Sequence, residues 1–205
     1  CLAQLLCYGI ATIWVSVALG LTALYINLQK EQVYLDPLTA LYNRNYLMHY
    51  LQALSQRRRK DGRILGLLLD VNDFKQINDT YGHATGDQVL KIFAGFLKEQ
   101  FRTTDIIGRV GGDEFMILMK NVRLDYSIHL HLQKLYTNLQ NIDIPELNGR
   151  KLSCSIGCAV APTDAESFSQ LYRLADHALY TAKQNGRGRF VIYHDIKSQQ
   201  ETVLS

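Results

Sequence analysis

Three clusters of charged residues have the types and positions that chemistry on a phosphorylated substrate would require. Asp70 follows the apolar run 64–69, and a carboxylate at the end of a buried strand is well placed to bind a hard cation. Asp113 and Glu114 come directly after two glycines, and adjacent carboxylates repel each other unless a cation neutralises them. The third cluster is the basic segment 183–189, whose side chains could hold phosphate groups.

Each cluster also has a plainer explanation when it is taken alone. Asp70 could cap a turn, the two acids after the glycines could lie in a solvated hairpin, and the basic segment could be an ordinary helix end. Together and in this order they favour one shared site. If the hairpin pairs beside the first strand, Asp70 and Asp113 can share one or two Mg²⁺ ions with a nucleotide phosphate chain.

The elements that must position these residues follow from hydrophobic periodicity. The run 64–69 is apolar throughout, which is typical of a strand buried on both faces. Two short β-like runs, 106–110 and 115–119, are separated by Gly111-Gly112, which predicts a hairpin. Asn43 can cap a helix that ends in the basic run 57–60, and a polar turn is expected after Asp70. Further helices are predicted around 89–97, 124–139 and 171–182, and further strands at 151–161 and 189–193. This order predicts an α/β sandwich of ferredoxin-like type, with a mixed and largely antiparallel sheet.

Charge is distributed very unevenly along the 205 residues. There are 22 Lys and Arg against 19 Asp and Glu, yet none of them precedes Lys30. Residues 1–26 include 20 apolar residues, and a helix of this length could cross a hydrocarbon core of roughly 30 Å. We therefore predict a transmembrane helix at 1–26, a linker at 27–35, a globular domain at 36–194 and a tail at 195–205. A buried core helix or a secretory signal segment are the alternatives.

The flanking charges and the cysteines predict where the globular domain lies. Basic residues downstream of the apolar segment favour the cytoplasmic side of the membrane. Cys154 and Cys158 are too far apart along one predicted strand to form a disulfide, which fits a reduced compartment. Because the chain begins with Cys rather than Met, we expect it to be a piece of a longer protein.

The segment 109–115, Arg-Val-Gly-Gly-Asp-Glu-Phe, resembles the signature of the GGDEF family of bacterial diguanylate cyclases. Stretches similar to other motifs of that family lie at 36–44, 70–87, 155–157 and 175–189, so the resemblance covers 36 to 193. It implies a nucleotidyl-cyclase palm fold at the bacterial inner membrane. It also implies that two GTP molecules condense into cyclic di-GMP with release of two pyrophosphates, in an antiparallel homodimer that holds one GTP in each domain.

The resemblance assigns the metal ligands and the nucleophile. Asp70, the backbone carbonyl of Val71 and Asp113 resemble the ligands of two Mg²⁺ ions, for which Mn²⁺ could substitute, and Glu114 lies beside them at the second metal. Asp113, Glu114 and Asp70 are thus the expected catalytic set. The attacking group is the ribose 3′-hydroxyl of the substrate, so no Ser, Cys or His nucleophile is needed.

Two further groups of residues are similar to the substrate contacts of the family. Asn78 and Asp87 occupy the positions that read guanine, and a carboxylate can accept from both the N1–H and the 2-amino group of that base. The expected contacts to ribose and phosphates are the backbone near Asp73 and Phe74, the side chains of Lys75, Lys183 and Arg187, and Gly112. The same resemblance shows two departures, Asn72 where aspartate is common and Ala40 where glycine is common.

Upstream of the signature, Arg102 and Asp105 match the RxxD motif to which the family's product binds as an inhibitor. Arg can bind guanine O6 and N7 in a fork, and Asp can bind the N1 edge. The plainer explanation is a solvated helix end. Lys134 is the nearest candidate for an additional basic contact. A catalytically silent receptor that binds cyclic di-GMP or GTP through Arg102 and Asp105 is the alternative function, and no nucleic-acid partner is expected.

Overall fold

Strand β2 (Ile64–Val71) lies in the interior of a six-stranded sheet, and all eight of its residues are buried. It pairs antiparallel with β4 (Glu114–Lys120) on one side and with β5 (Cys154–Ala161) on the other. The remaining strands are β1 (Tyr42–Asn43), β3 (Ile106–Gly111) and β6 (Phe190–Ile192), and the order across the sheet is β1-β3-β4-β2-β5-β6. The outer pairs β1–β3 and β5–β6 are parallel, so the sheet is mixed and largely antiparallel, as predicted.

This computed structural model describes residues 11–24, 34–56, 63–122 and 126–196. Contacts divide the chain into two compact units, Cys1–Leu35 and Asp36–Ser205. In the first unit, residues 11–24 form a helix. None of the helices among the described residues has both the length and the apolar character that crossing a membrane requires. The membrane helix predicted at 1–26 falls partly on 1–10 and 25–26, which are outside the described residues, as are 27–33 of the predicted linker.

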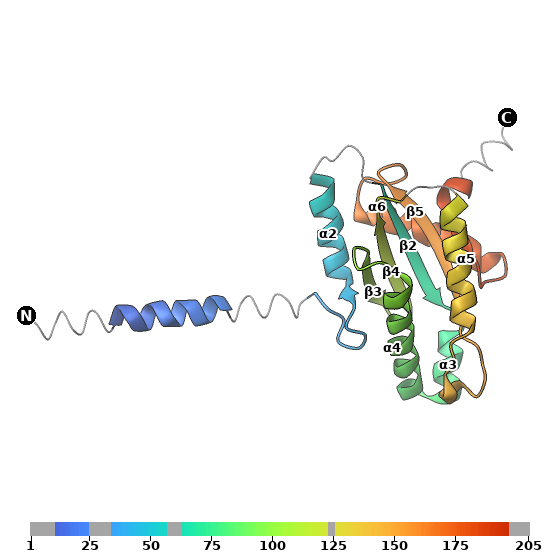
Figure 1. Ribbon diagram of the computed structural model, residues 1–205, viewed down its shortest axis with the longest axis horizontal. Helices are drawn as coiled ribbons and strands as arrows, with labels where there is room; N and C mark the ends of the chain where they lie inside the picture. The colour runs from blue at the N-terminus through green and yellow to red at the C-terminus, as the bar shows by residue number, and fades with distance from the viewer. Residues whose placement is uncertain (1–10, 25–33, 57–62, 123–125, 197–205) are drawn as a thin grey trace, which may run out of the picture. The chain divides into compact units, whose positions relative to one another are not determined.

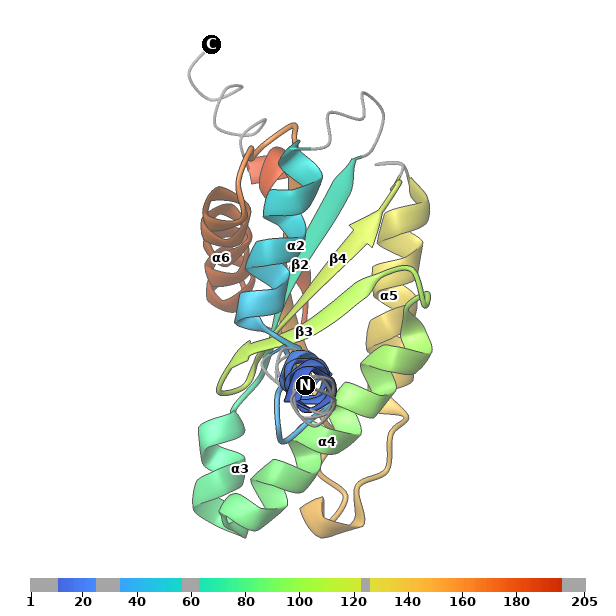
Figure 2. The same ribbon diagram turned by 90° about the vertical axis from the view of Figure 1, so that its left-hand side faces the viewer.

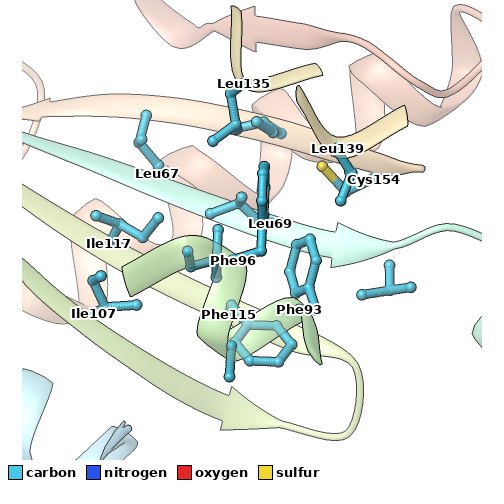
Figure 3. Close-up of a cluster of buried hydrophobic side chains, with 14 of the residues drawn as sticks. Leu67, Leu69, Phe93, Phe96, Ile107, Phe115, Ile117, Leu135, Leu139 and Cys154 are labelled. Atoms are coloured by element: carbon cyan, nitrogen blue, oxygen red, sulfur yellow. The ribbon is translucent and has the colours of Figure 1, made fainter. Parts of the chain in front are cut away.

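Helices cover both faces of the sheet in the second unit. Helices α4 (His83–Gln100) and α5 (Tyr126–Gln140) pack on one face, and α2 (Arg44–Gln56) and α6 (Phe168–Gln184) on the other (Figures 1 and 2). Side chains alternate along a strand, so Leu67 and Leu69 of β2 face α4 and α5 while Leu68 faces α2 and α6. Figure 3 shows the larger core, where side chains of β2 and β4 meet Phe93 and Leu135.

Helix α6 lies unusually close to β5. A Cβ atom on Gly157 would collide with the backbone of α6 at Ala175 and Leu179. Glycine at this point of β5 is therefore required for the close approach, which brings the last turn of α6 to the end of the sheet that carries Asp70.

The segment after Asp70 differs from the prediction. We expected a polar turn, whereas the structure has the helix α3 (Phe74–Tyr81), followed after Gly82 by α4. Phe74, Ile77 and Tyr81 have helical spacing and pack on the core, but a helix of only eight residues gives a pattern too short to identify from the sequence. Asp73 precedes the helix in a left-handed conformation with φ of 55°. Its side chain makes no capping hydrogen bond to the first turn.

The other predicted elements are present with small shifts. The backbone N–H of Tyr46 donates to Asn43 Oδ1 at 3.1 Å, which confirms Asn43 as the cap of α2. The predicted hairpin is β3–β4, and the strand expected from 151 begins at Cys154. A 3-10 turn (Pro145–Leu147) precedes β5, and residues 193–196 form a helical turn after β6. Cys154 and Cys158 are both buried and free.

Candidate active site

The three predicted catalytic acids meet at one end of β2 and β4. Asp70 lies directly opposite Glu114 in the antiparallel register, so their side chains share the α6 face of the sheet. Asp113 occupies the turn before β4, and its carbonyl accepts from the N–H of Val71 at 3.3 Å. The register therefore brings together acids that are 44 positions apart in the sequence (114 − 70).

A cleft of about 470 Å³ opens beside Asp70 and Asp113. Its walls come from the end of β2, the first turn of α3, the β3–β4 turn, and the last turn of α6 with the segment after it. The residues that line it are Asp70, Val71, Asn72, Asp73, Phe74, Lys75, Gln76, Asp79, Asp113, Lys183 and Arg187. Because α3 begins at this cleft, its unpaired N–H groups favour a bound anion such as phosphate.

The acids and bases of the cleft are paired with each other. Lys183 Nζ lies 2.7 Å from Asp70 Oδ2, and Arg187 donates to Asp73 Oδ1 at the same distance. Arg150, which no motif indicated, lies 3.9 Å from Asp73 Oδ2. A bound triphosphate and its cation could replace these ion pairs. The acids would then bind the metal ion, and the bases would bind the phosphates.

Asp70 and Glu114 are in surroundings that disfavour the negative charge of their carboxylates. Burial raises the pKa of Asp70, and the charge of Asp113 adds to that effect while Lys183 opposes it. Burial also raises the pKa of Glu114; the hydrogen bond from Tyr172 opposes the shift, and nearby acids, with Asp70 first among them, reinforce it. A divalent cation would relieve both effects, so these residues fit a metal ion.

As the side chains stand, no group of three His, Cys, Asp or Glu within the described parts of the chain could hold a metal ion. Lys183 Nζ pairs with Asp70 Oδ2, one of the oxygens that a metal ion would use. Mg²⁺ needs few protein ligands, since one or two carboxylates together with substrate phosphates are usual for it. The residues that would hold it are Asp70, the carbonyl of Val71 and Asp113, with Glu114 beside them.

Tyr172 is a site residue that the sequence did not reveal. Its hydroxyl donates to Glu114 Oε2 at 3.0 Å, and the guanidinium of Arg44 lies 5.4 Å from the centre of its ring. Burial and the contact with Glu114 raise the pKa of Tyr172 to about 12, so the hydroxyl stays protonated and remains a donor at neutral pH. Tyrosine at this point of α6 matched no motif.

A second unpredicted contact fixes the turn that carries Asp113. Arg109 donates from Nε and Nη2 to the carbonyl of Gly112, at 2.9 and 2.7 Å, and from Nη1 to Asp36 at 3.1 Å. Gly112 has φ of 53°, in the left-handed region that favours glycine. Ala40 has the same φ, so this position too favours glycine, the residue that is common there in the family.

Asn72, the other departure, ties the loop after β2 to β5. Its Nδ2 donates to Ser153 Oγ at 3.0 Å, and its Oδ1 accepts from Ser155 Oγ at 2.7 Å. An amide can donate and accept at once, whereas a carboxylate can only accept. Asn72 is buried and holds the backbone beside Val71 in place.

The guanine-reading candidates lie at the junction of α3 and α4. Asn78 is on α3, and its side chain occupies the space that a Cβ on Gly86 would need. Asp87 follows on the exposed side of α4. Within the described part of the chain, the residues that line the cleft include neither Asn78 nor Asp87, and neither Gly112 nor Glu114.

The predicted product-binding residues Arg102 and Asp105 line a separate pocket of about 390 Å³, at the opposite end of β3 and β4 from the Asp113 turn. Arg102, Asp105 and His131 line it, whereas Lys134, although described, is not among its lining residues. Asp105 is buried, and its Oδ2 accepts from the backbone N–H of Arg102 at 3.1 Å. One oxygen of this carboxylate is therefore already engaged in stabilising the turn 102–105.

Several known proteins are similar to this chain in sequence. The family model described as diguanylate cyclase, GGDEF domain, matches residues 33–189. The probable diguanylate cyclase DgcT of Escherichia coli is 34% identical over 170 residues, which are 82% of this chain and 37% of that protein. Diguanylate cyclase DgcS of Shewanella oneidensis is 35% identical over 170 residues, which are 82% of this chain and 55% of that protein.

Solved structures show the same fold. The GGDEF domain of DgcB from Caulobacter crescentus, crystallised in complex with c-di-GMP, superposes with a TM-score of 0.70 and 26% identity. The match covers 78% of this chain and 96% of that one. Within each of the two curated relatives, in contrast, the chain spans only about a third to a half of the length. The chain belongs to the GGDEF-domain family of diguanylate cyclases.

Proposed function

We propose that this protein condenses two GTP molecules into cyclic di-GMP and two pyrophosphates. The observation that supports this most is the meeting of Asp70, Asp113 and Glu114 beside a cleft that also holds Lys183 and Arg187. Acids for a metal and bases for a triphosphate then lie within one site. The family match and the relatives named as diguanylate cyclases support the same reaction.

In each half of the reaction, the 3′-oxygen of one GTP forms a bond to the α-phosphorus of the other. The bond between that phosphorus and the bridging oxygen breaks, pyrophosphate leaves, and the proton of the 3′-hydroxyl passes to water. Mg²⁺ bound at this site would neutralise the triphosphate and make the 3′-hydroxyl more acidic. Mn²⁺ is expected to substitute, because both ions accept carboxylate and phosphate oxygens.

The side chains of the cleft orient the nucleotide. Lys183 and Arg187 would leave Asp70 and Asp73 to bind the outer phosphates, and Lys75 adds a third positive charge. Asn78 and Asp87 would read the guanine base from the α3–α4 junction. As the family resemblance implies, each domain would bind one GTP, so the second GTP would come from another copy of the chain and the active form would be a homodimer.

We also propose product inhibition and membrane attachment. Cyclic di-GMP would bind in the pocket of Arg102 and Asp105, with Lys134 as a weak additional contact.

The apolar helix at 11–24, with exposed Ile13, Trp14 and Leu19, would belong to an anchor in the bacterial inner membrane, with the catalytic domain in the cytoplasm. Fractionation would test the anchor, since a protein recovered without membranes would exclude it.

A nucleotide-turnover assay tests the central proposal. The full chain with GTP and Mg²⁺ is expected to release cyclic di-GMP and pyrophosphate, and Asp113→Ala is expected to abolish this. Glu99→Ala, at an exposed acid of α4, is the matched control and should remain active. A protein that binds cyclic di-GMP without turnover would instead be the silent receptor.

Loss of product inhibition in Arg102→Ala would support the inhibitory site, and unchanged inhibition would exclude it.

A further inference from the structure

The contact between Tyr172 and Glu114 has a consequence for catalysis, because Glu114 is surrounded by negative charge. Asp70, Asp113 and Asp176 all lie near enough to act electrostatically on its carboxylate. Repulsion from three acids would turn a flexible glutamate away from Asp70 and Asp113. The Tyr172 hydroxyl, 3.0 Å from Glu114 Oε2, is the contact from α6 that holds the carboxylate against this repulsion.

We propose that Tyr172 is a positioning residue, which fixes Glu114 in the orientation needed at the metal site. This inference rests on the proposed function, in which Glu114 lies beside the second metal. Hydrogen-bond partners of this kind orient the groups around a metal and tune its affinity. Glu114 has two carboxylate oxygens, and Tyr172 engages Oε2, which leaves Oε1 to turn toward a cation.

Tyr172 is itself held in place on two sides. Its ring stacks on Phe168, one turn earlier in α6, with ring centres 6.2 Å apart. Arg44, the first residue of α2, lies over its ring at 5.4 Å. Two elements therefore fix the hydroxyl, which gives the hydrogen bond a defined direction.

The substitution Tyr172→Phe removes only the hydroxyl and keeps both ring contacts. With purified full chain and a non-hydrolysable GTP analogue, we expect Mn²⁺ binding, measured by electron paramagnetic resonance, to weaken about tenfold. In turnover, kcat should fall by about the same factor, while KM for GTP should stay within about twofold because the base and phosphate contacts are unchanged. The melting temperature should fall by only a few degrees, because a single hydrogen bond to Glu114 is lost.

The matched control is Tyr180→Phe, in the same helix, whose hydroxyl accepts a hydrogen bond from Gln184 Nε2 at 2.9 Å. This control should bind Mn²⁺ as the unaltered protein does. In a Glu114→Ala background, which has no acceptor for the tyrosine hydroxyl, Tyr172→Phe should have no further effect on Mn²⁺ affinity, because the two residues act through one contact. Arg44→Gln should weaken Mn²⁺ binding by a smaller factor, about two- to threefold.

Unchanged Mn²⁺ affinity in Tyr172→Phe would overturn this inference, and so would an effect that persists in full in the Glu114→Ala background. These results are independent of whether cyclic di-GMP is formed. If the unaltered protein lacked cyclase activity, the proposed function would fail, while the Mn²⁺ comparison would still decide whether Tyr172 positions Glu114.

Discussion

Lys183 Nζ lies 2.7 Å from Asp70 Oδ2, so its ammonium group forms an ion pair with a carboxylate oxygen that a metal ion would need. The side chain of Asp70 is 12% exposed, and such a charge is costly without a partner. Lys183 therefore stabilises the protein before the metal arrives, and the two cations compete for the same oxygen. Once Lys183 is displaced, its charge becomes free for the phosphates.

Replacement of Lys183 by glutamine should separate these two roles. Without nucleotide or metal, Lys183→Gln should lower the free energy of unfolding by about 1–3 kcal/mol, because Asp70 loses its partner. Added Mg²⁺ should then raise the melting temperature more than it does in the unaltered protein, since no ammonium competes with it. Thermal unfolding at a series of Mg²⁺ concentrations measures both. Lys75→Gln removes the same charge from the cleft and is the control; an equal Mg²⁺ response in all three proteins would refute the competition.

Arg109 holds the Asp113 turn through a fork that lysine cannot reproduce. Arg109→Lys keeps the positive charge but can offer only a point charge to the carbonyl of Gly112 and to Asp36. We expect turnover to fall about tenfold and the free energy of unfolding to fall by about 1–2 kcal/mol. Steady-state kinetics and urea unfolding are the measurements. Arg173→Lys, at an exposed position of α6, should change neither quantity, and full activity in Arg109→Lys would show that the fork is dispensable.

Asp36 should make the stability of the fold sensitive to acid. Burial alone would raise the pKa of Asp36, but hydrogen bonds from Thr39 and Arg109 outweigh it and hold the pKa below its usual value of 3.8. The unfolded chain therefore binds a proton more readily, and the contribution of Asp36 is fully present above about pH 5 and is lost as pH falls through the lowered pKa. The difference in unfolding free energy between the unaltered protein and Asp36→Asn should be largest at neutral pH and should shrink at pH 3. Urea unfolding at both pH values tests this, and a constant difference would contradict it.

Two glycines should respond to alanine in opposite directions. At Gly157 a Cβ would collide with the backbone of α6, so Gly157→Ala should lower the free energy of unfolding by about 3 kcal/mol. Gly95 lies on the exposed side of α4, where a Cβ has no heavy atom within 4 Å. Gly95→Ala should therefore raise the free energy of unfolding by up to about 1 kcal/mol, because alanine is the better helix former. Denaturant unfolding of both variants provides the comparison, and equal effects would show that α6 can move away from β5.

Features encoded locally were predictable from the sequence. The unbroken apolar run before Asp70 predicted a strand buried on both faces, and Gly111-Gly112 between two apolar runs predicted the hairpin. The order of the motifs indicated that Asp70 and Asp113 would share one site. Helix α3 was missed because its eight residues are too few for the helical spacing of Phe74, Ile77 and Tyr81 to stand out.

The contacts that make the site work were decided by the tertiary structure. The register sets Asp70 opposite Glu114, and the close approach of α6 at Gly157 brings Lys183 to Asp70 and Tyr172 to Glu114. Tyr172 and Glu114 are 58 positions apart, and Arg109 and Asp36 are 73 apart, so no local pattern relates them. A sequence records which side chains an element carries and which face they share. Which partner each one meets depends on how closely the layers pack, and that is fixed only when the whole core forms.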